Sequence, residues 1–163
     1  MIPYEWPRRP RKELILPSAP GVYALFLRDG AKLPVIDPPT DRLIYIGLGK
    51  SLARRCHFRG RTEGHSPRRS LAALVCNELK LKPFLGANGN YKFDQEGERR
   101  LDEWMHRNLL MAFALTDDLE RVEGELIVRF APPLNLNKCA QSPSHRAVSS
   151  LRASLLERAR NQA

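Results

Sequence analysis

The 163-residue sequence lacks the features of membrane-spanning, exported and disulfide-rich proteins. No apolar run approaches the roughly 18 to 20 residues that a membrane-spanning helix needs. Residues 1–17 contain no apolar signal core; they carry four prolines and a basic run, which predicts an extended arm. Three cysteines, Cys56, Cys76 and Cys139, are too few and too far apart for a disulfide framework or a paired zinc site. We therefore expect a globular, cytoplasmic protein.

A missing glycine argues against a nucleotide-binding loop. The stretch 43–55 contains Gly49-Lys50-Ser51, the tripeptide that ends the phosphate-binding loop of nucleotide hydrolases. That loop needs a second glycine five positions before Gly49, and Ile44 stands there. Without this glycine the backbone amides cannot wrap around a phosphate in the usual way. The glycine and the basic residues after it must serve another purpose.

Positive charge is abundant and unevenly distributed. The net charge is +9, and between residues 41 and 82 ten basic residues face only three acidic ones. Such a cluster predicts a surface that contacts the phosphates of a nucleic acid, although a solvated basic face is the alternative. Two of the arginines follow Pro67 at the start of a predicted helix, where backbone amides also favour phosphate. The predicted nucleic-acid contacts are Lys50, Arg59, Arg61, Arg68 and Arg69.

Hydrophobic patterns predict alternating strands and helices and contain no internal repeat. Apolar, β-prone runs bounded by glycine, proline and aspartate predict strands, whereas stripes of leucine and valine at helical spacing predict helices. The order of elements favours an α+β fold built on a small antiparallel sheet. The predicted strands are 20–30, 42–48 and 109–115, with a short one at 91–93, and the predicted helices are 50–59, 67–79, 95–108, 118–130 and 145–160.

One glutamate lies on the apolar face of its predicted helix. On a helical projection Leu119, Ile127 and their apolar neighbours fall within about 60° of Glu123, whereas Glu125 points away. A charged carboxylate on such a face is costly unless it has a basic partner, a hydrogen-bond network or a metal ion. The alternative is an ordinary glutamate at the edge of the helix, paired with an arginine.

The ordered motifs of the chain resemble those of a nuclease family. Gly21-Val22-Tyr23 and Tyr45-Ile46-Gly47 are similar to the two motifs that name the GIY-YIG family, and Arg55 follows the second motif at the family's spacing. The family's later signature is a glutamate followed by Leu-Ile, a proline and an asparagine. These positions are filled by Glu123, Leu126, Ile127, Pro132 and Asn135.

This resemblance implies a fold, an activity and a domain organisation. It implies three antiparallel strands flanked by helices, and hydrolysis of phosphodiesters in nucleic acid with one divalent metal ion, Mg²⁺ or Mn²⁺. The nuclease domain would cover residues 18–137. The arm 1–17 and a C-terminal amphipathic helix within 138–163 would lie outside that core, with the helix packed on the domain or appended to it.

The resemblance also implies roles for five catalytic residues. Glu123 would hold the metal ion, and Arg55 would donate two hydrogen bonds to the scissile phosphate. Tyr23 or Tyr45 would accept the proton of the attacking water; we favour Tyr45, and its basic neighbours would have to lower its pKa. Asn135 would orient a water or close the site by hydrogen bonds. Each has an ordinary alternative: Tyr23 and Tyr45 could be strand aromatics, Arg55 a solvated arginine, and Asn135 a turn residue.

Two departures from the family pattern bear on activity. Excision-repair members carry a lysine directly after the second motif, where this chain has Leu48; either Lys50 substitutes or the contact is absent. Homing endonucleases carry a histidine where this chain has Arg59, and the nearest histidine is His57. We expect a metal-dependent endonuclease, with DNA favoured over RNA. The alternative is a nucleic-acid-binding module that kept the fold and lost efficient catalysis.

Overall fold

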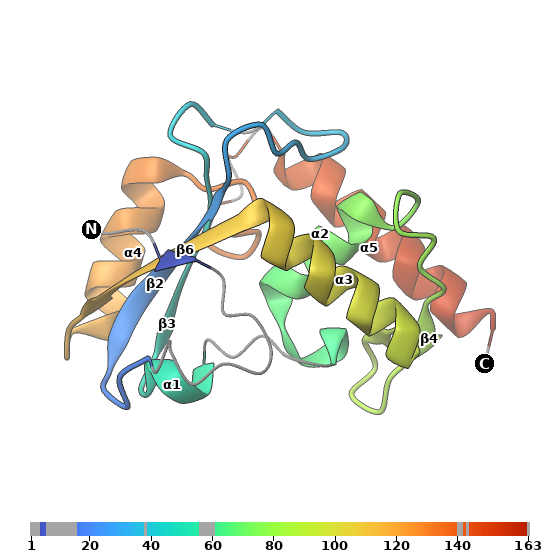
Figure 1. The fold of residues 1–163 in the computed structure, drawn as a ribbon, viewed down its shortest axis with the longest axis horizontal. Helices are drawn as coiled ribbons and strands as arrows, with labels where there is room; N and C mark the ends of the chain where they lie inside the picture. The colour runs from blue at the N-terminus through green and yellow to red at the C-terminus, as the bar shows by residue number, and fades with distance from the viewer. Residues whose placement is uncertain are drawn as a thin grey trace.

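A four-stranded antiparallel sheet lies between helix α4 (Leu119–Phe130) and the other long helices (Figure 1). The computed structural model describes residues 4–5, 16–37, 39–55, 61–139, 142 and 144–162. Its strands run in the order β1-β6-β2-β3, with β2 (Gly21–Leu27) central between β3 (Leu43–Gly49) and β6 (Leu109–Leu115). The predicted α+β fold and the three antiparallel strands are confirmed. The short β1 (Tyr4–Glu5) of the predicted arm adds to the free edge of β6.

The two faces of the sheet cover two separate cores. Tyr23, Leu25 and Leu27 of β2 face the larger core, whereas Ala24 faces the smaller one. This division follows from the strand period of two, which sends successive side chains to opposite faces. In β3 the register shifts opposite Leu25 and Phe26, as in a β-bulge.

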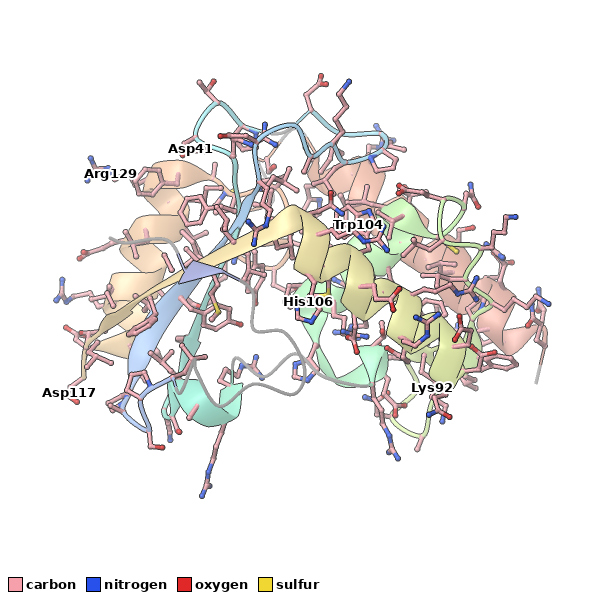
Figure 2. The ribbon with its side chains drawn as sticks, viewed as in Figure 1. Asp41, Lys92, Trp104, His106, Asp117 and Arg129 are labelled. Atoms are coloured by element: carbon pink, nitrogen blue, oxygen red, sulfur yellow. The ribbon has the colours of Figure 1, made fainter. Side chains whose placement is uncertain are left out.

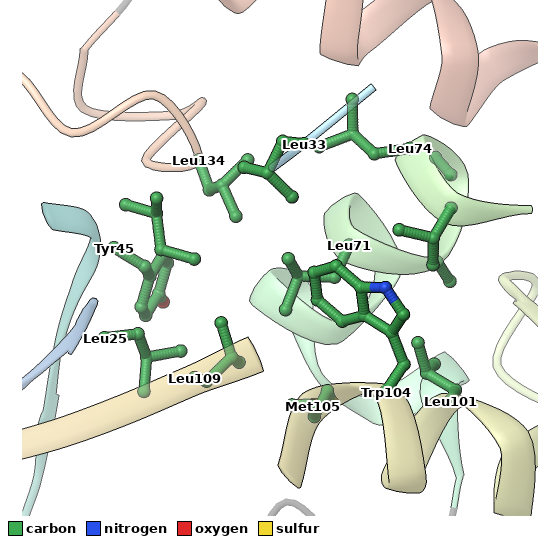
Figure 3. Packing of buried hydrophobic residues seen from close by; sticks show 14 of the residues in the cluster. Leu25, Leu33, Tyr45, Leu71, Leu74, Leu101, Trp104, Met105, Leu109 and Leu134 are labelled. Atoms are coloured by element: carbon green, nitrogen blue, oxygen red, sulfur yellow. The ribbon is translucent and has the colours of Figure 1, made fainter. Parts of the chain in front are cut away.

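Helices α2 (Ser66–Val75), α3 (Gln95–Asn108) and α5 (His145–Arg160) enclose the larger core. Trp104 of α3 lies beside Leu71 of α2 in the close-up of this core (Figure 3). Charged side chains such as Asp117 and Arg129 lie at the periphery (Figure 2). Between α2 and α3 come β4 (Phe84–Leu85) and β5 (Tyr91–Lys92), which form a small separate hairpin, and the 3-10 turn η1 (Thr62–Gly64) precedes α2.

The C-terminal helix is part of the packed domain. It lies against α2, and Val148, Leu155 and Ala159 are buried in the larger core. Val148 and Leu155 belong to the stripe that predicted this helix. Within the described ranges, no helix combines the length and the apolar character that crossing a membrane requires.

The turn after β3 is not a phosphate-binding loop. Gly49 ends β3, Lys50 and Ser51 form a bend, and α1 (Leu52–Arg55) follows. The amide of Leu52 donates to the carbonyl of Ala19 at 3.1 Å, and the next amide donates to the carbonyl of Pro17 at the same distance. Because these amides already have backbone partners, they cannot bind a phosphate. The predicted helix 50–59 is described only as far as Arg55.

Candidate active site

Two tyrosines lie on the face of the sheet that covers the larger core. Tyr23 stands opposite Gly47 across β2 and β3, and Tyr45 stands opposite Leu25. Their ring centroids are 6.0 Å apart. A side chain at position 47 would put its Cβ atom 2.5 Å from the Tyr23 hydroxyl, closer than non-bonded atoms come. The glycine of the second motif therefore leaves room for the tyrosine of the first.

The next glycine brings Arg55 to the end of β3. A Cβ atom at Gly49 would lie 2.7 Å from the Cβ atom of Arg55, so only glycine lets α1 fold back this closely. Leu52 of α1 is fully buried in the larger core, whereas Arg55 is exposed. The arginine thus has an anchored backbone and a guanidinium group open to a ligand.

Burial raises the pKa of Tyr45 above its ordinary value. The charge of Arg55 acts in the opposite direction and is the largest lowering influence on this pKa. Glu123 raises the pKa further, whereas a hydrogen bond with Tyr23 and the charge of Arg152 lower it. Arg55 and Arg152 do lower the pKa of Tyr45, but burial outweighs them, so the pKa stays above its ordinary value. Tyr45 is a neutral phenol at pH 7.

Glu123 is buried on helix α4 (Leu119–Phe130), as the helical projection predicted. Glu123 is only 6% exposed, whereas Glu125 is exposed to solvent. The Nζ of Lys138 donates to Oε2 of Glu123. This lysine is the basic partner that a buried carboxylate requires. The sequence predicted the need for a partner but gave no sign that Lys138, on the segment after α4, supplies it.

Asn135 holds the segment after α4 against the edge strand β3. Its Oδ1 accepts from the amide of Ile46 at 2.9 Å, and its Nδ2 donates to the carbonyl of the same residue at 2.7 Å. One residue earlier, the Leu134 amide donates to the carbonyl of Ile44 at 3.0 Å. The Asn135 side chain thus pairs with the N–H and C=O of an edge-strand residue, as a neighbouring strand would. Both of its side-chain hydrogen bonds go to the β3 backbone.

The predicted phosphate contacts differ in their exposure. Lys50 and Arg61 are exposed, and Arg61 forms a long ion pair with Glu63 at 4.0 Å. Arg69 is half-buried on α2. Arg59 and His57 lie outside the described residues. The remaining residue, Arg68, is buried within the protein.

The prediction that Arg68 contacts a phosphate is wrong. The residue is 0% exposed, and its Nη2 lies 2.6 Å from Oε2 of Glu98. Its Nη1 bonds Oδ1 of Asp102 at 2.5 Å, and its Nε bonds Oγ1 of Thr62 at 3.1 Å. Two carboxylates from α3 thus compensate its charge. A helical-face test would have found this, because Arg68 lies three residues before Leu71 on the buried stripe.

Glu123 offers a carboxylate that a hard divalent cation could take as a ligand, in competition with Lys138. Among the residues described, no group of three or more histidine, cysteine, aspartate or glutamate side chains could form a protein-only metal site. A single carboxylate suits Mg²⁺ or Mn²⁺, which also take water and substrate oxygens as ligands. Glu123 is therefore the residue that could hold such an ion.

The sequence was compared with the profiles of known protein families to find the family of this chain. The profile of the GIY-YIG catalytic domain matches residues 21–157. The chain belongs to the GIY-YIG family. Searches of curated proteins and of solved structures found no significant match. The GIY-YIG match extends beyond residue 137, where the sequence placed the end of the motif-bearing core, and includes most of α5.

GIY-YIG catalytic domains are nuclease domains, so membership implies phosphodiester hydrolysis and a nucleic-acid substrate. In this GIY-YIG domain Tyr23 and Tyr45 come from β2 and β3, Arg55 from α1 and Glu123 from α4. Arg55 and Glu123 are both close enough to Tyr45 for their charges to influence its pKa, although they are far apart in the sequence.

Proposed function

We propose that the protein is a nuclease that hydrolyses phosphodiesters with one divalent metal ion, and that DNA is its substrate in preference to RNA. The observation that carries the proposal is the environment of Tyr45. The charges of the exposed Arg55 and of the buried Glu123 both influence the pKa of its hydroxyl. A hydroxyl, a cation and a carboxylate can together help to position a water, neutralise phosphoryl charge and hold a metal ion, which phosphodiester hydrolysis uses.

Glu123 would hold the ion, which when bound would neutralise charge on the phosphoryl oxygens and acidify a water. The guanidinium of Arg55 would bind the same phosphoryl group through two N–H donors. This contact would strengthen as negative charge develops, so Arg55 would contribute to turnover more than to binding.

Tyr45 would work as a hydrogen-bond donor rather than as a general base. A phenol with a raised pKa keeps its proton at pH 7 and can donate it to a phosphoryl oxygen or hold the attacking water. The hydrogen bond with Tyr23 would orient this hydroxyl. Asn135 would act as a positioning residue, because its amide holds the chain after α4 beside β3.

A binding module without efficient catalysis is the second candidate. Leu48 in place of the lysine of excision-repair relatives favours it, and so does the raised pKa of Tyr45. This candidate predicts salt-dependent binding of nucleic acid without a metal-dependent product.

A substrate panel distinguishes the two functions. Purified protein is incubated with supercoiled plasmid, single-stranded DNA, branched DNA and RNA, each with Mg²⁺, Mn²⁺ or chelator. We expect cleavage of DNA with either metal and none with chelator. Binding of every substrate without any metal-dependent product would reject the nuclease proposal and support the binding module. Cleavage of RNA alone would overturn the preference for DNA.

A further inference from the structure

Two further basic residues, Arg69 of α2 and Arg152 of α5, lie near each other. Nη1 of Arg152, on α5, donates to the hydroxyl of Ser66 at 3.3 Å and to that of Ser70 at 3.4 Å, both on α2. Arg152 also forms a side-chain hydrogen bond with Tyr91, whose hydroxyl donates to the backbone carbonyl of Arg69 at 2.6 Å. These contacts hold the guanidinium of Arg152 next to the N-terminal half of α2.

The two arginines at this place, Arg69 and Arg152, repel each other. Burial lowers the pKa of Arg69, and the charge of Arg152 lowers it further. Nε of Arg69 is buried without a hydrogen-bond partner. In the described part of the chain, no carboxylate forms an ion pair with either residue. Two close cations with no acid between them are costly, unless an anion joins them.

The adjacent residue on the same helix shows the opposite arrangement. Arg68 is fully buried, and Glu98 and Asp102 compensate its charge. Helix α2 therefore carries two consecutive arginines. Two carboxylates neutralise Arg68 inside the protein, whereas no carboxylate of the described residues neutralises Arg69, and its Nε is unbonded.

The uncompensated pair lies within reach of the catalytic groups. The charge of Arg152 acts on the pKa of Tyr45, as the charge of Arg55 does. Helix α5, which supplies Arg152, packs along α2 at the side of the molecule away from α4 (Figure 1).

We infer that Arg69 and Arg152 bind a second phosphate of the substrate backbone, next to the one that Arg55 and Tyr45 contact. This inference rests on the proposed function, because its ligand is a phosphodiester of the nucleic acid. Arginine suits this role, since its planar group gives several N–H donors to phosphate oxygens. The C-terminal helix then takes part in substrate binding as well as in packing, and Arg152 is a binding residue.

Binding without cleavage tests the inference. Fluorescent single-stranded DNA and RNA of one sequence are titrated with full-length protein in chelator, at several salt concentrations. The variants are Arg152→Gln, which keeps an amide donor for the serines, and Arg69→Gln, whose Nε has no partner to lose. The matched control is Arg160→Gln, an exposed arginine at the end of the same helix. Circular dichroism and thermal melting report folding of each variant.

We expect Arg152→Gln and Arg69→Gln each to weaken binding by about tenfold, and Arg160→Gln to weaken it much less. On a single strand, the slope of log affinity against log salt should flatten by about 0.7 for each phosphate that the variant no longer neutralises. If Arg152→Gln unfolds, Arg69→Gln carries the test alone. Affinity and slope equal to those of the control would overturn the inference.

The same variants separate this inference from the proposed function. If the wild type fails to cut any substrate while the two variants still bind more weakly and with a flatter salt slope, hydrolysis is wrong and the phosphate site stands. If the wild type cuts and the two variants bind like the control, the phosphate site is wrong and hydrolysis stands.

Discussion

Replacing Arg68 by methionine should destabilise the protein severely, although the sequence presents this residue as one of two adjacent arginines. Its guanidinium is fully buried and bonds Glu98 at 2.6 Å and Asp102 at 2.5 Å. Methionine fills a similar volume but leaves the Glu98 carboxylate buried without its cation. Removing one partner of a buried ion pair costs about 3–5 kcal/mol, against a total stability of about 5–15 kcal/mol.

Urea unfolding followed by circular dichroism measures this cost. The matched control is Arg69→Met, the same change one residue along the helix. Because Arg69 has no acidic partner among the residues described, we expect that variant to stay within about 1 kcal/mol of the wild type.

A second substitution tests the cause of the loss. Adding Glu98→Gln to Arg68→Met removes the orphaned charge but keeps an oxygen for the amides of Thr62 and Phe93, which bond Glu98 at 2.9 and 3.2 Å. Part of the lost stability should return. The reasoning is refuted if Arg68→Met costs less than about 1 kcal/mol, or no more than Arg69→Met.

The surroundings of Asn135, Tyr91 and Lys138 lead to three further predictions. Asn135→Ala leaves the backbone N–H and C=O of Ile46 without their partner and should cost about 2–4 kcal/mol in urea unfolding; a loss under about 1 kcal/mol would contradict the role of Asn135 in holding the chain against β3. Burial raises the pKa of Tyr91 above 10.0 in the folded protein. The neutral phenol therefore contributes its full stability below about pH 10, and this contribution is lost as pH rises towards the folded-state pKa. The free energy of unfolding of Tyr91→Phe should fall less steeply above about pH 10 than that of the wild type, and parallel curves would refute this. Lys138→Met removes the cation paired with Glu123, so calorimetry should find Mn²⁺ binding tighter by about tenfold, and unchanged affinity would exclude competition.

Local sequence signals predicted most of the fold. The run Gln95–Asn108 reads as a helix because Leu101, Trp104 and Met105 recur at helical spacing, and Asp94 caps it by accepting from the Gly97 amide at 2.7 Å. The apolar strand Leu109–Leu115 follows directly. Here propensity, capping and periodicity all agree, so tertiary contacts had little to override.

The candidate site was predictable only where a residue's own helix carried the signal. Glu123 was recognised as buried because its apolar neighbours lie on one helix face. Its partner Lys138 and the partners of Arg68 come from other segments, and no local pattern encodes such pairings. The pKa of Tyr45 depends on burial and on charges from three helices, which the sequence does not reveal.

The most direct test of the central claim is the single-turnover cleavage rate of DNA by Glu123→Gln in Mg²⁺. The matched control is Glu125→Gln, the same change two residues along α4 at an exposed position. If Glu123 holds the catalytic ion, Glu123→Gln should fold and bind DNA normally but cut at least about 10³-fold more slowly, whereas Glu125→Gln should cut like the wild type. Equal cleavage rates for the two variants would contradict the account.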